Sequence, residues 1–353
     1  VNIPDANFKA YLVGNFGINT NMDTAIQVSE AAAFTGVITC YNLGIADLTG
    51  IEAFTSLAVL GCTNSNLTSI DVSNNLQLTT LYCEGNNLDS LDVSNNLQLT
   101  KLLCYGNQLS YLNVTANTAL EELNCSNNLL DSLDVTNNTA LKELNCSYNP
   151  FTNGIDVSNN SLLEIFECRN SQLTNLDVTA NTALIELRCM NNMLDSLDLS
   201  NNTLLEHFDC SSNQLTSLDV TANTALIELN FANNQTGNID FSTNTALNYL
   251  NVINNQITDL DVIVNTDLIT LSCANNLLTD LDVSNNILLE VLNCSANQLT
   301  KLDITSNTLL TKLYCYVNQL TELDITSNTS LIRLYCNDNQ LTELDFSNHP
   351  SIA

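Results

Sequence analysis

Cysteine recurs through this chain at an almost constant spacing, and that spacing restricts the possible folds more than any other feature. The thirteen cysteines lie at positions 40, 62, 83, 104, 125, 146, 168, 189, 210, 273, 294, 315 and 336. Successive gaps are 21 or 22 residues, except for a gap of 63 after Cys210, which equals three periods of 21. Phe231 and Val252 occupy the equivalent position in the two turns without cysteine. A fixed period of about 20 to 29 residues indicates a solenoid built from stacked turns.

Each turn repeats the pattern LxxLxCxxNxL followed by LDVSxNT, for example "LIELRCMNNML" at 184–194 and "LDLSNNT" at 197–203. Side chains alternate between the two faces of a strand, so Leu187 and Cys189 are expected to point inward and Arg188 and Met190 outward. The LDVS segment alternates in the same way. Little of the turn has helical periodicity, so the convex side is expected to be extended. The sequence predicts a β-rich solenoid of about fifteen turns with a parallel strand ladder.

The repeat is the leucine-rich repeat consensus with cysteine in its third apolar position. It resembles the internalin family of bacterial surface proteins, in particular the internalin J type with 21-residue repeats and a cysteine ladder. The resemblance covers roughly residues 35 to 347, and "LTGIEAFTSL" at 48–57 is similar to the 22-residue internalin repeat. The resemblance implies a bacterial protein, secreted or on the cell surface, that recognises a host or environmental ligand. It identifies no ligand.

Composition excludes several classes of function. Eight Lys and Arg against 38 Asp and Glu give a formal net charge of −30, which repels nucleic acid and anionic membranes. No apolar run approaches the roughly 20 residues that span a bilayer, so no membrane insertion is expected. His207 and His349 are the only histidines and lack a nucleophile partner, and the carboxylates recur as repeats, so we expect no enzyme.

The cysteine position is predicted to hold core filler. Phe231 and Val252 replace cysteine there, whereas a nucleophile or metal ligand would not tolerate apolar replacement. Thirteen cysteines cannot all pair, and the parallel Cβ vectors of a ladder suit a disulfide badly. We therefore expect reduced, buried thiols.

Three polar ladders accompany the cysteines. Asparagine can supply a donor and an acceptor to the backbone at the corners of a turn. One asparagine ladder includes Asn86, Asn107, Asn128, Asn149, Asn192 and Asn213, and the other includes Asn75, Asn96, Asn117, Asn138 and Asn160. An aspartate recurs at the LDVS position, with Asn113 as the exception, and is expected to cap the turn that follows. In the alternative interpretation, this Ser-Asp-Ser surface gathers cations or orders water.

The N-terminal segment, residues 1–34, is expected to form a helical cap over the solenoid core of residues 35–347. Pro4 suits a helix start, and Phe8, Tyr11, Leu12 and Phe16 follow helical spacing. Residues 348–353 are expected to be a tail. The first residue is Val1 and the chain ends in "LDFSNHPSIA" without an evident cap, so we expect a removed N-terminal signal and a longer native protein.

The stretch "NTNMDTAIQVSE" at 19–30 matches an EF-hand loop at the positions that supply calcium ligands. Thr24 stands where the sharp turn usually needs glycine, and only two ligands are carboxylates, so any site would be weak. The alternative is a polar loop that caps a helix and binds no metal. The predicted calcium ligands are Asn19, Asn21, Asp23, Ala25 through its carbonyl, Gln27 through water, and Glu30.

The outward positions of the strands lie three before, one before and one after each cysteine position. Five of the eight basic residues occupy them, as do seven of the ten tyrosines. Lys101 is expected to pair with Glu122, and Arg188 to lie between Glu167 and Asp209. Lys312 and Arg333 instead stack on each other, beside three tyrosines, in a strongly acidic chain. The predicted ligand-binding residues are Lys312, Tyr314, Tyr316, Arg333, Tyr335, Tyr82, Tyr105 and Arg188.

These features predict a monomeric recognition or adhesion module that binds a protein ligand on its strand face. Tyrosines and acidic or amide side chains also suit sugars, so a carbohydrate-binding surface is the main alternative. A passive spacer that displays another domain is the third. Apart from weak calcium binding, no cofactor is expected.

Overall fold

The computed structural model describes residues 1–349 of the 353-residue chain. It divides the chain into two compact units, residues 1–173 and residues from 174 onward. The predicted tail at 348–353 therefore lies mostly outside the described residues.

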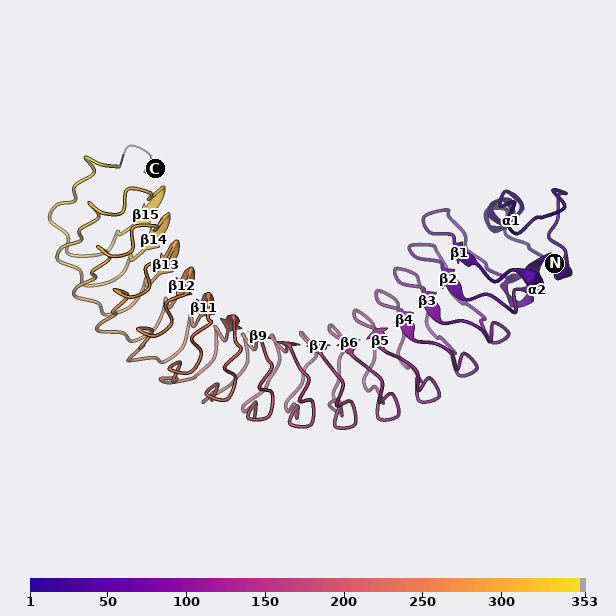
Figure 1. Ribbon diagram of the computed structural model, residues 1–353, viewed down its shortest axis with the longest axis horizontal. Helices are drawn as coiled ribbons and strands as arrows, with labels where there is room; N and C mark the ends of the chain where they lie inside the picture. The colour runs from indigo at the N-terminus through magenta and orange to yellow at the C-terminus, as the bar shows by residue number, and fades with distance from the viewer. Residues whose placement is uncertain (350–353) are drawn as a thin grey trace. The chain divides into compact units, whose positions relative to one another are not determined.

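The first unit consists of a helical cap and seven strands that each pair in parallel with the next along the chain (Figure 1). The cap contains helices α1 (Ala6–Val13) and α2 (Val28–Ala33), and a 3-10 helix, η1, spans Ile51–Ala53. The strands are β1 (Val37–Thr39), β2 (Val59–Gly61), β3 (Thr80–Tyr82), β4 (Lys101–Leu103), β5 (Glu122–Asn124), β6 (Glu143–Asn145) and β7 (Ile165–Glu167).

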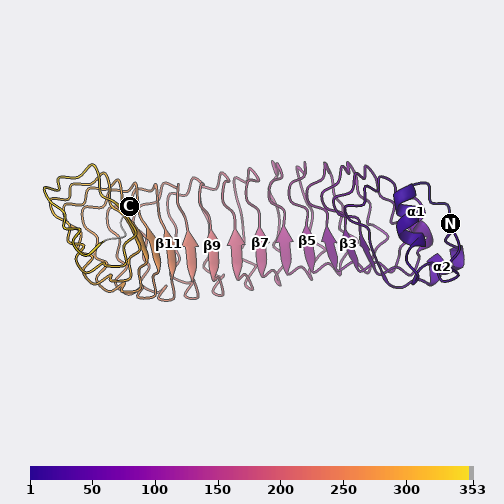
Figure 2. The same ribbon diagram turned by 90° about the horizontal axis from the view of Figure 1, so that it is seen from above.

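The second unit continues the same pattern with eight parallel strands, of which β9 and β11 are labelled in Figure 2 as arrows that point the same way. The strands are β8 (Glu186–Arg188), β9 (His207–Asp209), β10 (Glu228–Asn230), β11 (Tyr249–Asn251), β12 (Thr270–Ser272), β13 (Val291–Asn293), β14 (Lys312–Tyr314) and β15 (Arg333–Tyr335). The predicted solenoid with a strand ladder and about fifteen turns is confirmed.

The core follows the predicted alternation. In β5, for example, Leu123 is 1% exposed and the following Cys125 is fully buried, while Glu122 and Asn124 face outward and are half-buried. Phe231 and Val252 are also fully buried, which confirms that this position accepts any apolar group of suitable size. Between β1 and β15, the only helix among the described residues is η1, so the convex side is extended as expected.

The helical cap differs from the prediction at its end. Asp5 caps α1 by accepting hydrogen bonds from the backbone of Asn7 and Phe8, both at 2.9 Å. Phe8 and Leu12 are fully buried, as their spacing predicted. The helix ends at Val13, however, and Phe16 is 70% exposed. The prediction that Phe16 continues the apolar face of this helix is therefore wrong. The chain turns after Gly14, and helical spacing no longer applies.

The two asparagine ladders hold successive turns together in different ways. In the first ladder, the Asn128 side chain donates to the carbonyls of Cys104 and Cys125 at 3.1 and 3.0 Å and accepts from the backbone of Leu109 at 3.0 Å. In the second, the Asn138 side chain donates to the carbonyls of Val114 and Asn117 at 2.9 and 2.7 Å.

The carbonyl oxygen of the Asn138 side chain accepts no hydrogen bond. The same holds for Asn96, Asn117, Asn202, Asn223 and several later members of the second ladder. The expectation that each asparagine supplies both a donor and an acceptor is therefore correct for the first ladder and wrong for the second. The second ladder acts through its donors alone, each amide bridging two carbonyls of the preceding turn.

The aspartates cap the turns that follow them, as predicted. Asp134, for example, accepts hydrogen bonds from the Thr136 hydroxyl at 2.7 Å and the Thr136 backbone at 3.0 Å. These hydrogen bonds hold the pKa of Asp134 below its usual value, because they stabilise the ionised form. Asn113, the exception in the ladder, accepts the same two bonds from Thr115.

One residue per turn, two positions after the cysteine position, has a left-handed backbone. Glycine fills it at Gly85 and Gly106, and asparagine at several later turns. At Gly85 a Cβ atom would collide with the end of the Asn64 side chain, so a larger residue there would require that side chain to move. Val317 adopts the same conformation with φ of 54°, which is costly for a β-branched residue.

Candidate functional site

The strand face carries the predicted ligand-binding residues, and the structure divides them into separate groups. We define the tyrosine–cation cluster as Lys312, Tyr314, Tyr316, Arg333 and Tyr335. Strands β14 and β15 pair so that Lys312 lies opposite Arg333 and Tyr314 opposite Tyr335, as the period predicted. The rings of Tyr314 and Tyr335 stack with centroids 5.3 Å apart and planes 13° from parallel.

The two cations of this cluster have no acidic partner. Throughout residues 1–349, no ion pair within 4.0 Å involves Lys312 or Arg333. Arg333 and Tyr335 are exposed, and Lys312 and Tyr314 are half-exposed. Like charges opposite each other on neighbouring strands destabilise a sheet. The cluster therefore offers stacked aromatic area and unpaired positive charge to solvent.

Tyr82 and Tyr105 belong to the first unit and make a different group. Lys101 on β4 lies 5.8 Å from the centroid of the Tyr82 ring. Its Nζ atom is 2.5 Å from Glu122 Oε2, which confirms the predicted ion pair and raises the pKa of Lys101. Tyr105 is 38% exposed. Because Lys101 already has a carboxylate partner, this group lacks the unpaired charge of the tyrosine–cation cluster.

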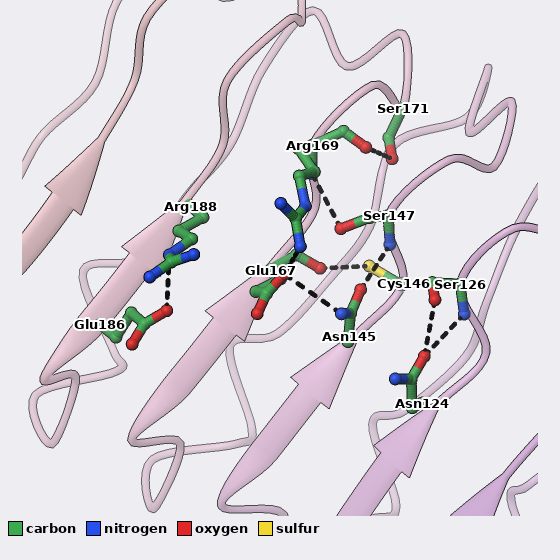
Figure 3. Close-up of polar contacts among 10 residues, drawn as sticks. All are labelled: Asn124, Ser126, Asn145, Cys146, Ser147, Glu167, Arg169, Ser171, Glu186 and Arg188. Carbon is green, nitrogen blue, oxygen red and sulfur yellow. Dashed lines mark hydrogen bonds and ion pairs between the residues drawn. The ribbon is translucent and has the colours of Figure 1, made fainter. Parts of the chain in front are cut away.

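Arg188 lies opposite Asp209 on the neighbouring strand, as predicted, but the predicted ion pairs with Glu167 and Asp209 are wrong. Its Nε atom lies 2.6 Å from Oε1 of Glu186, on the same strand, and the two side chains point toward each other in Figure 3. Glu167 instead pairs with Arg169 at 2.5 Å, also within one segment of chain (Figure 3). Residues two apart on a strand share a face, and long side chains can bend toward each other there.

A hollow that the sequence analysis missed lies on the second unit, across β8 to β11. It has a volume of about 230 Å³, and we call it the β8–β11 hollow. Its lining residues are Arg188, Met190, His207, Phe208, Asp209, Glu228, Asn230 and Tyr249. Only Arg188 was predicted as a ligand-binding residue. The sequence did contain a signal for the hollow. Most of the other lining residues occupy outward positions of successive turns, and such positions lie side by side on the strand face.

The predicted calcium loop is held by hydrogen bonds of its own. Glu30 accepts from the Thr20 hydroxyl at 2.8 Å and from the backbone of Gln27 at 2.9 Å, as part of a capping box for α2. Asp23 accepts from the backbone of Ala25 at 2.8 Å and from the side chain of Gln27 at 3.1 Å.

The two asparagines of the loop also make internal bonds. Asn21 accepts from the backbone of Asp23 at 2.9 Å. The side chain of Asn19 donates to carbonyls of Val13 and Asp23, and its own oxygen is buried without a hydrogen bond. Calcium would have to replace several of these bonds, so the arrangement suits a helix-capping loop, and calcium binding stays a prediction.

The cysteines show the features of core residues. Twelve of the thirteen cysteines are buried, and Cys336, in the last turn, is half-buried. Burial raises the pKa of Cys125 and Cys273 to about 12, so their thiols are poor nucleophiles at neutral pH. Among the described residues, no group of three or more His, Cys, Asp or Glu side chains is placed to hold a metal ion.

The stacked turns, their inward leucines and the buried column of cysteines define a leucine-rich repeat solenoid with a cysteine ladder. No protein-family model matches the chain. The solved structure of the functional domain of InlJ from Listeria monocytogenes, which includes a cysteine ladder, is 36% identical and superposes with a TM-score of 0.81. That match covers 93% of this chain and 77% of the InlJ chain. The chain belongs to the internalin family.

Other comparisons agree with this assignment or with the fold. Internalin J of Listeria monocytogenes serotype 4b (strain F2365) is 40% identical over 72 residues, which are 20% of this chain and 8% of that protein's length. The crystal structure of the internalin inlF from Listeria monocytogenes is 23% identical, covers 99% of this chain and 94% of its own, and has a TM-score of 0.67. The plant peptide hormone receptor RGFR1 in complex with RGF2 is 20% identical over 90% of this chain and 62% of the receptor, with a TM-score of 0.71. The last two likenesses concern the fold alone.

Proposed function

We propose that the protein is a recognition module, secreted or on the bacterial cell surface, that binds a protein ligand on its strand face and has no enzymatic activity. The observation that carries the proposal is the tyrosine–cation cluster, where a stacked tyrosine pair lies beside two cations without acidic partners. Tyrosine and arginine are enriched among the residues that contribute most to protein interfaces. An exposed like-charge pair that costs stability in the free protein gains when a ligand neutralises it.

Further observations support the same proposal. Membership of the internalin family supports the extracellular location, and within residues 1–349 no helix is both long and apolar enough to cross a membrane. The plant peptide hormone receptor RGFR1, which shares the fold, is in complex with RGF2, and this supports a binding role for a solenoid of this kind. The ring of His207 contacts Glu228, the ring of His349 contacts the backbone carbonyl of Asn328, and the proposal assigns neither histidine a catalytic role.

The test uses peptides of known sequence rather than an unknown natural ligand. Peptides are selected from a random displayed library on the intact protein, and their Kd values are measured for the protein and for the Lys312→Ser, Arg333→Ser double variant. We expect the double variant to lose about 1 to 3 kcal/mol of binding free energy, or roughly tenfold to a hundredfold in Kd. Binding should also weaken as salt rises, because the side chains are exposed.

The matched control is the Lys9→Ser, Lys301→Ser double variant. Both of these lysines are exposed and lie outside the cluster, so the control removes the same charge without touching it. Equal affinities of the three proteins for every selected peptide would show that the cluster is not the binding surface. A parallel glycan array tests the carbohydrate alternative: saturable glycan binding that the cluster variant abolishes, with no peptide selected, would overturn the protein-ligand proposal.

A further inference from the structure

The β8–β11 hollow lies on the strand face of the second unit. Four successive strands contribute to its lining, since Arg188, His207, Glu228 and Tyr249 come from β8, β9, β10 and β11. Its volume of about 230 Å³ is below the roughly 300 to 1,000 Å³ of pockets for drug-sized ligands. The hollow therefore suits one side chain of a larger partner.

The charges around the hollow do not cancel. Arg188 has Glu186 as its partner at 2.6 Å. Asp209 and Glu228 have no Lys or Arg within 4.0 Å anywhere in the described part of the chain. The two remaining carboxylates give the hollow a negative potential, which the formal net charge of −30 reinforces.

Three hydrogen bonds hold Asp209 in place, whereas the exposed Glu228 makes one contact, with a histidine. Asp209 Oδ1 accepts from the Ser211 backbone at 2.9 Å and from its hydroxyl at 2.6 Å. Asp209 Oδ2 accepts from the side chain of Asn230 at 3.0 Å. Glu228 Oε2 lies 3.2 Å from Nδ1 of His207. Acceptors that are already oriented lose little entropy when a ligand binds.

The remaining walls are apolar. Phe208 is 2% exposed and forms part of the lining, and Met190 and Tyr249 are half-exposed beside it. Lysine and arginine combine an aliphatic stem, which packs on such walls, with a cationic head that carboxylates and an aromatic face attract. We propose that the β8–β11 hollow is a subsite for one lysine or arginine side chain of the protein ligand. This proposal rests on the proposed function, because it assigns the chemistry of one ligand residue.

The three methionines of the chain make a direct test possible. Met190 lines the hollow, whereas Met193 and Met22 are exposed outside it. Methionine methyl groups labelled with ¹³C would give three NMR signals from the intact protein. The probes are N-acetyl-arginine amide and N-acetyl-lysine amide, with N-acetyl-citrulline amide as the neutral isostere of arginine and methyl galactoside as a sugar.

We expect the two cationic probes to shift the Met190 signal saturably in the millimolar range, and Met22 and Met193 to stay in place. Asp209→Asn and Glu228→Gln should each weaken the binding at least tenfold. Glu206→Gln, on the same turn but outside the lining, removes the same charge and should have little effect. Unchanged Met22 and Met193 signals in each variant would show that the fold is retained.

The proposal is overturned if Met190 does not respond to either cation, or if citrulline or the sugar shifts it as strongly. It is also overturned if Glu206→Gln weakens binding as much as the two lining variants, because the attraction would then be non-specific. These outcomes are independent of the peptide experiment on the tyrosine–cation cluster. Failure of one proposal can therefore be told from failure of the other.

Discussion

The cysteine ladder predicts a large difference in thiol reactivity between the native and the denatured protein. The perturbation is a disulfide thiol reagent added at pH 8, first to native protein and then to protein in concentrated guanidinium. Twelve cysteines are buried, and Cys336 in the last turn is half-buried. We expect one thiol to react quickly in the native protein and thirteen to react after denaturation.

The size of the difference follows from the thiolate fraction, because the thiolate is the reactive form. With a pKa of about 12, Cys125 and Cys273 are thiolate in about one molecule in 10⁴ at pH 8. A thiol at the usual 9.0 would be thiolate in about one in ten. Reaction at the buried positions should therefore be slower by about 10³-fold, before any steric protection is counted.

The assay follows the released chromophore with time. Cys336→Ala should remove the fast native phase and lower the denatured count by one, while the slow phases stay unchanged. Several fast thiols in the native protein would refute the buried ladder. Fewer than about ten thiols in the denatured protein would reveal disulfides and refute the role of cysteine as core filler.

Four further predictions concern stability. Asn286→Ala removes two buried hydrogen bonds of 2.9 Å to the preceding turn, so it should lower the free energy of unfolding in urea by about 2 kcal/mol. The control Asn285→Ala changes the exposed neighbour and should lower it by less than about 0.5 kcal/mol. Equal losses in the two variants would contradict the structural role of the ladder. Val317→Asn should stabilise the protein by about 1 kcal/mol, because asparagine tolerates the left-handed backbone better than valine; a loss of stability would show that valine is not strained there. Millimolar Ca²⁺ should raise the Tm if the N-terminal loop binds it, and Glu30→Gln should abolish the increase; no increase in either protein would leave the helix-capping role alone. Hydrogen bonds lower the pKa of the ladder aspartates below 3.8 in the folded state. The contribution of these aspartates to the free energy of unfolding is therefore complete above about pH 4 and is lost as the pH falls through the lowered pKa values. A urea midpoint that rises between pH 4 and pH 2 would contradict this.

Part of the candidate site could be predicted from the period. Residues 21 apart in a regular turn lie opposite each other on neighbouring strands, so Lys312 meets Arg333 and Tyr314 meets Tyr335. The same rule gave the ion pair of Lys101 with Glu122. These pairings depend only on register, which the repeat determines.

The β8–β11 hollow and the partner of Arg188 could not be predicted in this way. Each depends on how long side chains bend over the strand face, and several rotamers are compatible with one register. Arg188 could reach several acids of its own and neighbouring strands, and the structure selects Glu186. Side chains of β8 to β11 line the hollow, so its shape depends on the rotamers that they adopt.

The sequence by itself determined the solenoid, the inward column of cysteines, the capping aspartates and the faces on which the tyrosines and cations lie. It could do so because every turn repeats its neighbour, so a local pattern implies the long-range contacts. Tertiary structure alone decided where α1 ends, which asparagine oxygens stay without hydrogen bonds, and which charges are neutralised. These outcomes depend on side-chain conformations and on packing between turns, and a repeat pattern specifies the positions of residues but not the directions of their side chains.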